Sequence, residues 1–499
     1  MNYDSRIMNN VIKRMVWVFV VACFTLGAAY AQQKVVLDLE RAVRLATDSS
    51  LTAQKYQSVY DISRYQYLSW IATRKPQIAL ESTPFMHERY MTQRYLSFED
   101  IDAYRMQQNL YSQAGITITQ AMEPWGGEFY GSTQFGFLHT FGENSQNQFM
   151  TVPFAVGYRQ NMLLYNPWKW AKKIEPLKLS RAEQELSYGI ETASEQAVEK
   201  FFNLAMAQEG LRMSEKLLAS CDTIYAIAER RFKIASISKA ELSILQLDKT
   251  NARIALANAR IAHTRAMQEL ATYLGMDRHT IIELDIPDLM QGLRINTEEA
   301  VQYARENNPQ YMESRQATEE ARRDAAKARV EKSLNLSLDV SVGLNQVANR
   351  FVDAFKRPLL QDMALVTLSV PIVDWGKRRN AYLSAMSRVE AAERAEQESA
   401  RDTELDVMMT VNDFNEQQAI VEASQEALEI AEEAYNQSLL RFVKAQSTTT
   451  DLSLAQTNWL NAQQNKIASL QNYWIIYYRL RRLTLYDYEN KQVIRYVRK

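Results

Sequence analysis

Histidine and cysteine, which often carry enzyme chemistry or bind metal ions, are few in this chain of 499 residues, with four histidines and two cysteines. Its four histidines show no spacing such as His-x-x-x-His, which would place two imidazoles on one face of a helix. They are His87, His139, His263 and His279. The sequence also has no phosphate-binding glycine loop and no Gly-x-Ser-x-Gly elbow. We therefore predict no catalytic residues, no metal site and no cofactor.

Two carboxylates occupy matching positions at the expected starts of two helices. Ser238-Lys239-Ala240-Glu241 and Thr448-Thr449-Thr450-Asp451 both fit a capping pattern, in which a hydroxyl and an acid three residues later satisfy the free amides of the first turn. This interpretation gives Glu241 and Asp451 a structural role.

The elements that carry these two segments occur twice in the chain, 210 positions apart. Arg231-Phe232 recurs as Arg441-Phe442, and Asn251-Ala252 recurs as Asn461-Ala462. A ladder of apolar residues seven apart recurs at the same offset. Its members are Leu204, Leu211, Leu218, Tyr225 and Phe232, and then Phe414, Val421, Leu428, Tyr435 and Phe442. A seven-residue apolar repeat makes helices supercoil against their neighbours. We therefore predict two long coiled helical hairpins, over residues 167–274 and 377–486.

Short segments with alternating apolar and polar residues precede each hairpin. They cover about 76–90 and 151–164 in the first repeat and about 334–345 and 363–373 in the second. An extra hairpin is expected at about 113–141. A soluble, half-buried sheet explains such alternation. Strands of a transmembrane barrel explain it too, and several segments reach the ~9–11 residues that a spanning strand needs.

The N-terminus has the features of a secretory signal peptide, residues 1–31. Lys13-Arg14 is followed by an apolar run and by Ala29-Tyr30-Ala31, a small-x-small cleavage site. Residues 20–23 also resemble a lipoprotein box, which leaves lipidation of Cys23 as an alternative. Cys221 is then the only cysteine of the mature chain, so no internal disulfide is expected. The formal net charge of −1 shows no basic bias towards nucleic acid.

These elements predict an internally duplicated chain that is mainly α-helical and carries a membrane β-barrel. We expect a first repeat over 32–274, a linker over 275–296, a second repeat over 297–486 and a tail over 487–499. Four core strands cannot close a barrel by themselves, because side chains fill even a barrel of ~8 strands. Oligomerisation is therefore expected.

The duplicated order of helix, helix, strand, strand, long helix and return helix resembles the TolC-type outer-membrane efflux proteins of Gram-negative bacteria. The likeness covers nearly the whole mature chain. Its local motifs are the two Arg-Phe pairs before the hairpin ends and the strand-to-helix phrases 160–163 and 370–376. Asn166-Pro167-Trp168-Lys169-Trp170 and the extra hairpin resemble the Bacteroidetes-type branch. The sequence leaves three alternatives for that hairpin: it joins the barrel, lies in its lumen or lies outside it.

The resemblance implies a homotrimer in the outer membrane, with a 12-strand barrel in the lipid and a 12-helix tunnel through the periplasm. It also implies a periplasmic adaptor, or membrane fusion, protein and an inner-membrane RND or ABC transporter as partners. The protein would then be the passive exit duct of a tripartite efflux pump or a type I secretion system. A structural or adhesive coiled-coil surface protein is the alternative interpretation.

The resemblance further assigns roles near the hairpin ends. Arg231, Phe232, Arg441 and Phe442 would mark the region that docks the adaptor. Glu241 and Asp451, with Lys239, are candidates for the periplasmic gate, where six carboxylates of a trimer would repel one another and could have raised pKa values. The sequence departs from the family pattern at Ala235, Ala445, Ser447 and Leu454.

Overall fold

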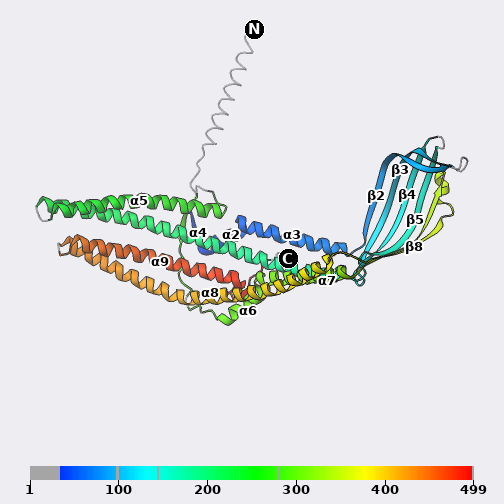
Figure 1. Cartoon of the computed structure of the whole chain (residues 1–499). Helices are drawn as coiled ribbons and strands as arrows, with labels where there is room; N and C mark the ends of the chain where they lie inside the picture. The colour runs from blue at the N-terminus through cyan, green and yellow to red at the C-terminus, as the bar shows by residue number, and fades with distance from the viewer. Residues whose placement is uncertain are drawn as a thin grey trace, which may run out of the picture. The chain divides into compact units, whose positions relative to one another are not determined.

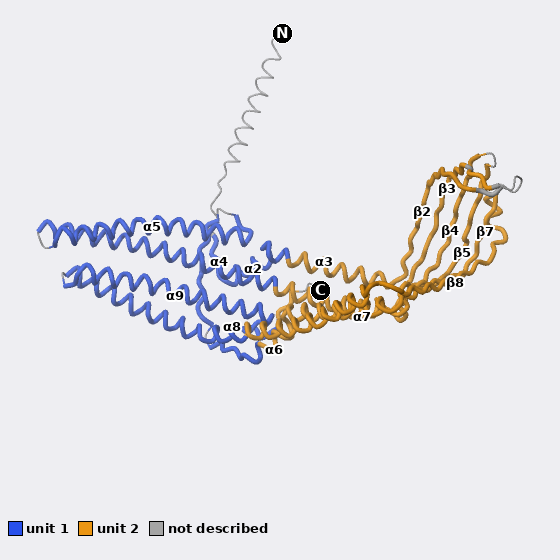
Figure 2. The backbone as a smooth tube through the Cα atoms, viewed as in Figure 1, with its two compact units in different colours: residues 1–55, 189–300, 408–493 blue, residues 56–188, 301–407, 494–499 orange. Residues whose placement is uncertain are grey.

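A computed structural model describes residues 34–96, 101–142, 145–234, 237–277, 280–290, 292–444 and 446–496 (Figure 1). The expected signal peptide lies outside the described residues, as do Cys23, His279, Ala235 and Ala445. The chain divides into two compact units, and each unit draws on both sequence repeats (Figure 2). The repeats are therefore units of sequence and not of packing, because the long helices run through both compact units.

One unit contains a six-stranded antiparallel sheet. Its strands are β2 (Gln77–Leu96), β3 (Ile101–Met122), β4 (Gly127–Phe141), β5 (Gln146–Gln160), β7 (Asn335–Ala348) and β8 (Leu359–Ser369). Their order is β2-β3-β4-β5-β7-β8, so strands of both repeats form one continuous sheet (Figure 1). β2 and β8 are the two edges.

The pairing places the extra hairpin inside this sheet. β3 pairs with β2 along its length, and β4 pairs with β5, so the added strands separate β2 from β5. The chain thus contributes six strands and not the four that the sequence analysis took as the core. β8 also begins at Leu359, earlier than the expected 363, and ends at Ser369 because Pro371 cannot donate to a ladder.

The same unit holds α3 (Leu51–Thr73) and α7 (Pro309–Ser333), which each lead into the sheet. α7 begins where Asn308 accepts a hydrogen bond from the amide of Gln310, with Pro309 in the first turn. A short 3-10 helix, η1 (Phe351–Phe355), lies in the connection between β7 and β8.

The long helices are α4 (Pro167–Lys233) and α8 (Lys377–Val443), each of 67 residues. At ~1.5 Å per residue each is about 100 Å long. α5 (Lys239–Tyr273) and α9 (Thr449–Thr484) return from their ends. The ends of the two hairpins share one apolar core, which includes Leu245, Leu428, Tyr435, Phe442 and Trp459. Tyr435 and Trp459 stack with their centroids 5.1 Å apart.

The compact unit that contains these hairpin ends also contains the shorter elements near the repeat starts. β1 (Lys34–Asp38) pairs in parallel with β6 (Ile281–Asp285). α2 (Leu39–Ser49) follows β1, and α6 (Thr297–Asn307) follows β6 and belongs to the other unit from Val301 onward. β9 (Tyr486–Asp487) and β10 (Gln492–Val493) form a small antiparallel turn after α9.

Candidate functional site

The first hairpin end is stabilised by a complete capping box at the start of α5. The amide of Glu241 donates to Ser238 Oγ at 3.2 Å, and the amide of Ser238 donates to Glu241 Oε2 at 2.8 Å. The backbone and side-chain hydrogen bonds from Ser238 lower the pKa of Glu241. This carboxylate therefore serves the N-terminus of α5.

The second hairpin end repeats this arrangement at the start of α9. The amide of Asp451 donates to Thr448 Oγ1 at 3.1 Å, and Thr448 Oγ1 donates to Asp451 Oδ2 at 2.7 Å. The side-chain and backbone hydrogen bonds from Thr448 lower the pKa of Asp451. Within one chain, both acids thus have lowered pKa values, opposite to the raised values that we considered for a ring of gate carboxylates.

Lys239, the third gate candidate, is the first residue of α5 and is exposed. It makes no hydrogen bond or ion pair with any residue in the described part of the chain. A single chain therefore gives Lys239 no structural role, in contrast to its neighbour Glu241.

The two Arg-Phe pairs are related in sequence but not in environment. The guanidinium of Arg231 lies over the ring of Phe442, 5.4 Å from its centroid. It also donates to the carbonyl oxygens of Phe442 at 3.0 Å and Val443 at 2.9 Å, at the C-terminal end of α8. Phe442 is 4% exposed, whereas its counterpart Phe232 is 39% exposed. One Arg-Phe contact is therefore made inside the chain, and the partners for a second remain on its surface.

The sheet has one apolar face, which the strand registers define. Ile78, Ile118, Gly131, Val156 and Val342 are successive partners across β2, β3, β4, β5 and β7, so they share that face. Ile78, Ile118, Val156 and Val342 are all exposed in the single chain. An apolar sheet face of this extent indicates contact with lipid or with another protein.

Aromatic residues form two groups on the apolar face. Near the helical end of the sheet, Phe129 and Tyr158 have centroids 5.1 Å apart, and Trp125 packs against both. The second group lies further along the strands and includes η1; its members are Phe135, Phe137, Phe149, Phe351 and Phe355. From Phe129 to Phe137 is eight residues, or about 27 Å of strand.

The opposite face of the sheet is polar. Glu128 and Arg159 pair across β4 and β5 at 2.6 Å, and Tyr130 donates to Asp339 of β7 at 3.0 Å. Tyr130 lies on this polar face because it is adjacent in β4 to Phe129, which lies on the apolar face. Tyr165, Trp168, Trp170 and Trp375 lie outside the strands, in the segments that follow them.

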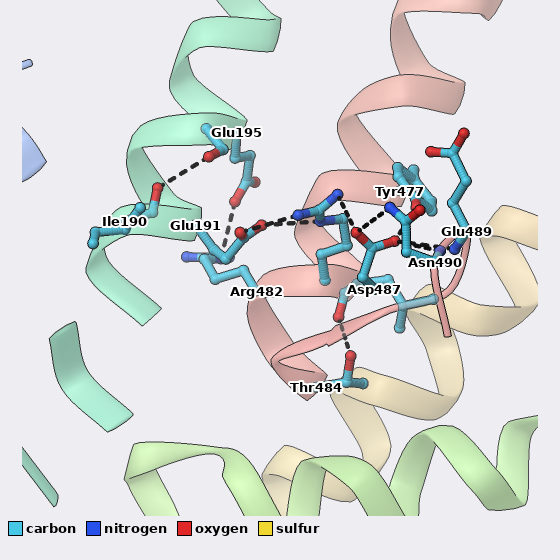
Figure 3. A network of polar contacts seen from close by, with 12 residues as sticks. Ile190, Glu191, Glu195, Tyr477, Arg482, Thr484, Asp487, Glu489 and Asn490 are labelled. Carbon is cyan, nitrogen blue, oxygen red and sulfur yellow. Dashed lines mark hydrogen bonds and ion pairs between the residues drawn. The ribbon is translucent and has the colours of Figure 1, made fainter. Parts of the chain in front are cut away.

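A buried ion network lies near the C-terminal end of α9. Arg481 contacts Glu191 of α4 at 3.2 Å and Asp487 of β9 at 3.3 Å. Figure 3 shows Glu191 and Asp487 within this network, where the side-chain amide of Asn490 also donates a hydrogen bond to Asp487 at 3.0 Å. The side chain of Arg481 is 14% exposed and that of Glu191 is 0% exposed, so both charges are shielded from water and are stabilised mainly by each other and by neighbouring polar groups.

Burial opposes the charge on Arg481, but the attraction of Glu191 and Asp487 and of the nearby tyrosine hydroxyls outweighs it and raises the pKa of Arg481. Burial raises the pKa of Tyr473 to about 12. The network holds the C-terminal segment against α4 and is structural. Local sequence patterns do not predict this network, because Glu191 and Arg481 are 290 residues apart and the only local signal is Arg481-Arg482 in a tyrosine-rich stretch.

The described part of the chain holds no group of three or more His, Cys, Asp or Glu side chains arranged to bind a metal ion. Among the same residues, none of the helices combines the length and the apolar character needed to cross a membrane.

A family model described as "Outer membrane efflux protein" matches residues 300–484. Protein CyaE of Bordetella pertussis is 25% identical over 291 residues, which are 58% of this chain and 61% of that protein. That match spans about three fifths of the length of this relative.

Solved structures of outer-membrane proteins share the fold over most of the chain. The CmeC outer membrane channel of Campylobacter jejuni superimposes with a TM-score of 0.66 at 13% identity, covering 89% of this chain and 85% of that one. VceC, an outer membrane protein of Vibrio cholerae, gives a TM-score of 0.63 at 14% identity, covering 90% and 95%.

The helical hairpins, the strand order and these matches agree. The solved structures with this fold include outer membrane channels. Residues 300–484 therefore match the outer membrane efflux protein family, and the chain has the fold of solved outer-membrane channels.

Proposed function

We propose that three copies of this chain form an exit duct that passively conducts substrates across the periplasm and the outer membrane. The observation that carries this proposal is the six-stranded sheet, with one apolar face and two unpaired edges. An unpaired edge exposes backbone donors and acceptors, which lipid cannot satisfy. A sheet of this kind therefore calls for closure with further copies.

The two edge strands of the sheet have directions that allow them to pair between neighbouring copies. β2 and β8 are five strands apart in an antiparallel sheet, so they run in opposite directions. β8 of one copy can therefore pair antiparallel with β2 of the next. Three copies then close a barrel of eighteen strands, and not the twelve that the family resemblance implied. Barrels of 16–18 strands leave an aqueous channel.

The aromatic groups on the apolar face support a position in the bilayer. About 27 Å of strand at a tilt of ~40° corresponds to about 21 Å of membrane thickness. This is close to the ~25 Å apolar band that aromatic girdles flank in outer-membrane barrels. The groups around Phe129 and Phe137 would then lie near the two interfaces.

The helices of the three copies would form the tunnel through the periplasm, and the hairpin ends would dock a periplasmic adaptor protein. An inner-membrane RND or ABC transporter would supply the energy and select the cargo. Glu241, Asp451 and Lys239 would surround the tunnel entrance, where six ionised carboxylates attract cations. A structural or adhesive surface protein would need long helices but no sheet with an exposed apolar face.

Conductance across a planar bilayer tests the proposal. Protein extracted in detergent and reconstituted should give discrete current steps, since an aqueous path through the barrel and tunnel carries ions. The Arg159→Glu variant, which places two acids together on the polar face, should shift the steps toward cation selectivity. Protein that inserts as a folded oligomer yet never conducts would contradict the duct and leave the structural interpretation.

A further inference from the structure

The contact between the two hairpins inside one chain provides a pattern for the contact between neighbouring copies. We infer that Arg441 of one copy binds Phe232 of the next in the way that Arg231 binds Phe442 within a chain. The inference rests on the proposed function, since it requires the trimer, and it names the residues through which the hairpin ends of neighbouring copies meet.

The intramolecular contact has two parts that the second copy can reproduce. The guanidinium of Arg231 lies 5.4 Å from the ring centroid of Phe442, a cation–π geometry. The same guanidinium donates to the last carbonyl groups of α8, which lack partners within the helix. Phe442 is buried as part of the apolar core of the hairpin ends. The contact therefore needs an arginine, an aromatic ring and a helix C-terminus.

All three requirements are present a second time on the surface of the chain. Arg441 is exposed near the end of α8. Phe232 is 39% exposed at the end of α4, where the carbonyl groups of Phe232 and Lys233 correspond to those of Phe442 and Val443. The 210-residue offset relates every member of one set to a member of the other.

A second pair of positions further along the helices agrees with this assignment. Within the chain, Ser220 Oγ and Tyr435 Oη are 2.9 Å apart, joining α4 to α8. The corresponding positions are Ile430 and Tyr225. Ile430 is 62% exposed on α8, and it would cover the ring of Tyr225 in the neighbouring copy.

A third pair extends the contact toward the middle of the hairpins. Gly210 and Gln464 line one small cavity between α4 and α9. Their counterparts are Ile420 on α8 and Ile254 on α5, which are 52% and 56% exposed. Aliphatic side chains therefore occupy, on the open faces, the positions that line this cavity inside the chain. Two exposed isoleucines that meet would remove apolar area from water.

The occupant of these faces is a second copy, because the matching surface is the other repeat of the same chain. In a closed ring of three copies, each hairpin has one neighbour from its own chain and one from the next. The internal contact serves the first junction, and the Arg441–Phe232 contact serves the second. Both junctions then have the same chemistry around the ring.

Chemical cross-linking with a short bismaleimide tests this inference. Arg441→Cys and Phe232→Cys are combined in a Cys221→Ala background, so that no other cysteine of the mature chain can react. The matched control carries Arg231→Cys and Phe442→Cys. The first pair should give covalent dimers and trimers on a denaturing gel, whereas the control pair should give only a single chain of altered mobility.

The outcomes separate the inference from the function on which it rests. If light scattering shows three copies but the first pair links nothing between chains, the inference is wrong and the duct stands. If the wild-type protein is monomeric, the proposed function fails and the inference fails with it.

A double-mutant cycle gives a second test that needs no cysteine. Arg441→Ala and Phe232→Ala should each lower the temperature at which the trimer dissociates in detergent, and the double variant should be no worse than the more damaging single one. Strictly additive losses would overturn the assigned contact, because residues that do not interact have additive effects. Arg441→Lys should recover only part of the loss, since lysine keeps the charge but not the planar fork.

Discussion

The width of the proposed barrel would depend on β3 and β4, and removing these strands should narrow it in a calculable way. Residues 89–145 can be replaced by an Asn-Gly turn that joins β2 directly to β5. Ile78 and Val156 share one face, as do Glu88 and Gln146, and ten residues separate each pair along its strand. The shortened chain therefore keeps the pairing register and the apolar face while it loses two strands.

The expected change follows from barrel geometry. With strands ~4.8 Å apart and a tilt of ~40°, the backbone radius is about 18 Å for eighteen strands and about 12 Å for twelve. Inward side chains take up about 5 Å, half the ~10 Å spacing of packed sheets. The free radius then falls from about 13 Å to about 7 Å.

Exclusion of neutral polymers from the extracellular side measures this radius. Polyethylene glycol with a hydrodynamic radius of about 10 Å, between the two free radii, should enter the wild-type barrel and reduce its conductance. It should not enter the barrel of the shortened variant. Applying the polymer from the outer side matters, because the periplasmic end of the duct sets its own limit on entry.

A matched control removes sequence without removing strands. Residues 91–96 of β2 and 101–106 of β3 extend beyond β4, since Phe141 of β4 pairs with Gln108. Replacing residues 91–106 by an Asn-Gly turn keeps six strands and should leave the polymer cut-off unchanged. An equal cut-off for the wild type and the strand-deleted variant, both trimeric, would refute the eighteen-strand closure.

Three further predictions concern the packing of the chain. Arg481→Met should destabilise the protein by about 3–5 kcal/mol in thermal unfolding, because Glu191 and Asp487 would stay buried after the loss of the guanidinium. The control Arg253→Met, at an exposed position of α5, should change stability by less than about 0.5 kcal/mol, and equal effects would contradict the role of the network. Gly157→Ala should lower the free energy of unfolding by about 1–3 kcal/mol, since the new Cβ would lie 2.5 Å from Tyr130 Cζ and 2.6 Å from the Val340 carbonyl oxygen. The control is Gly131→Ala, whose Cβ would lie no closer than 3.7 Å to another atom, and the melting temperatures of the two variants in detergent should differ accordingly. The backbone amides in the first turns of α5 and α9 should resist hydrogen exchange at neutral pH and lose that protection well below pH 3.8. A carboxyl whose pKa is lowered by folding stabilises the fold above its ordinary pKa, and this stabilisation is lost as the pH falls through the lowered pKa. Asp451→Asn should remove this pH dependence from α9, and an unchanged profile would show that the cap does not cause it.

Sequence patterns predicted the helices closely because their signals are local and repeated. The seven-residue ladder and the capping residues Ser238 and Thr448 give helix boundaries within a few residues of α4, α5, α8 and α9. Such signals depend on neighbours within one or two turns, so they can be recognised without knowledge of the fold.

The sheet was harder to predict, because pairing between strands is not local. The alternation in 334–345 was visible, but β2 and β3 extend through polar stretches such as 88–94 that carry no apolar period. Their ladder is made by backbone hydrogen bonds, which any sequence can supply. The place of the extra hairpin could therefore be settled only by its partners β2 and β5.

The two Arg-Phe pairs show a further limit. The 210-residue repeat reveals both pairs but gives no reason to expect that their environments differ. Their difference arises because only Arg231 meets the other hairpin of its own chain. The buried network around Arg481 similarly depends on Glu191, which is far away in the sequence, so no local sequence motif predicts the network.

The most direct test of the duct is the mass and shape of the protein extracted from outer membranes in detergent, by light scattering and negative-stain imaging. The account predicts three copies of the chain, with a membrane-wide head and a long tapered body that needs detergent to stay in solution. A monomer, or a rod that is soluble without detergent, would contradict it.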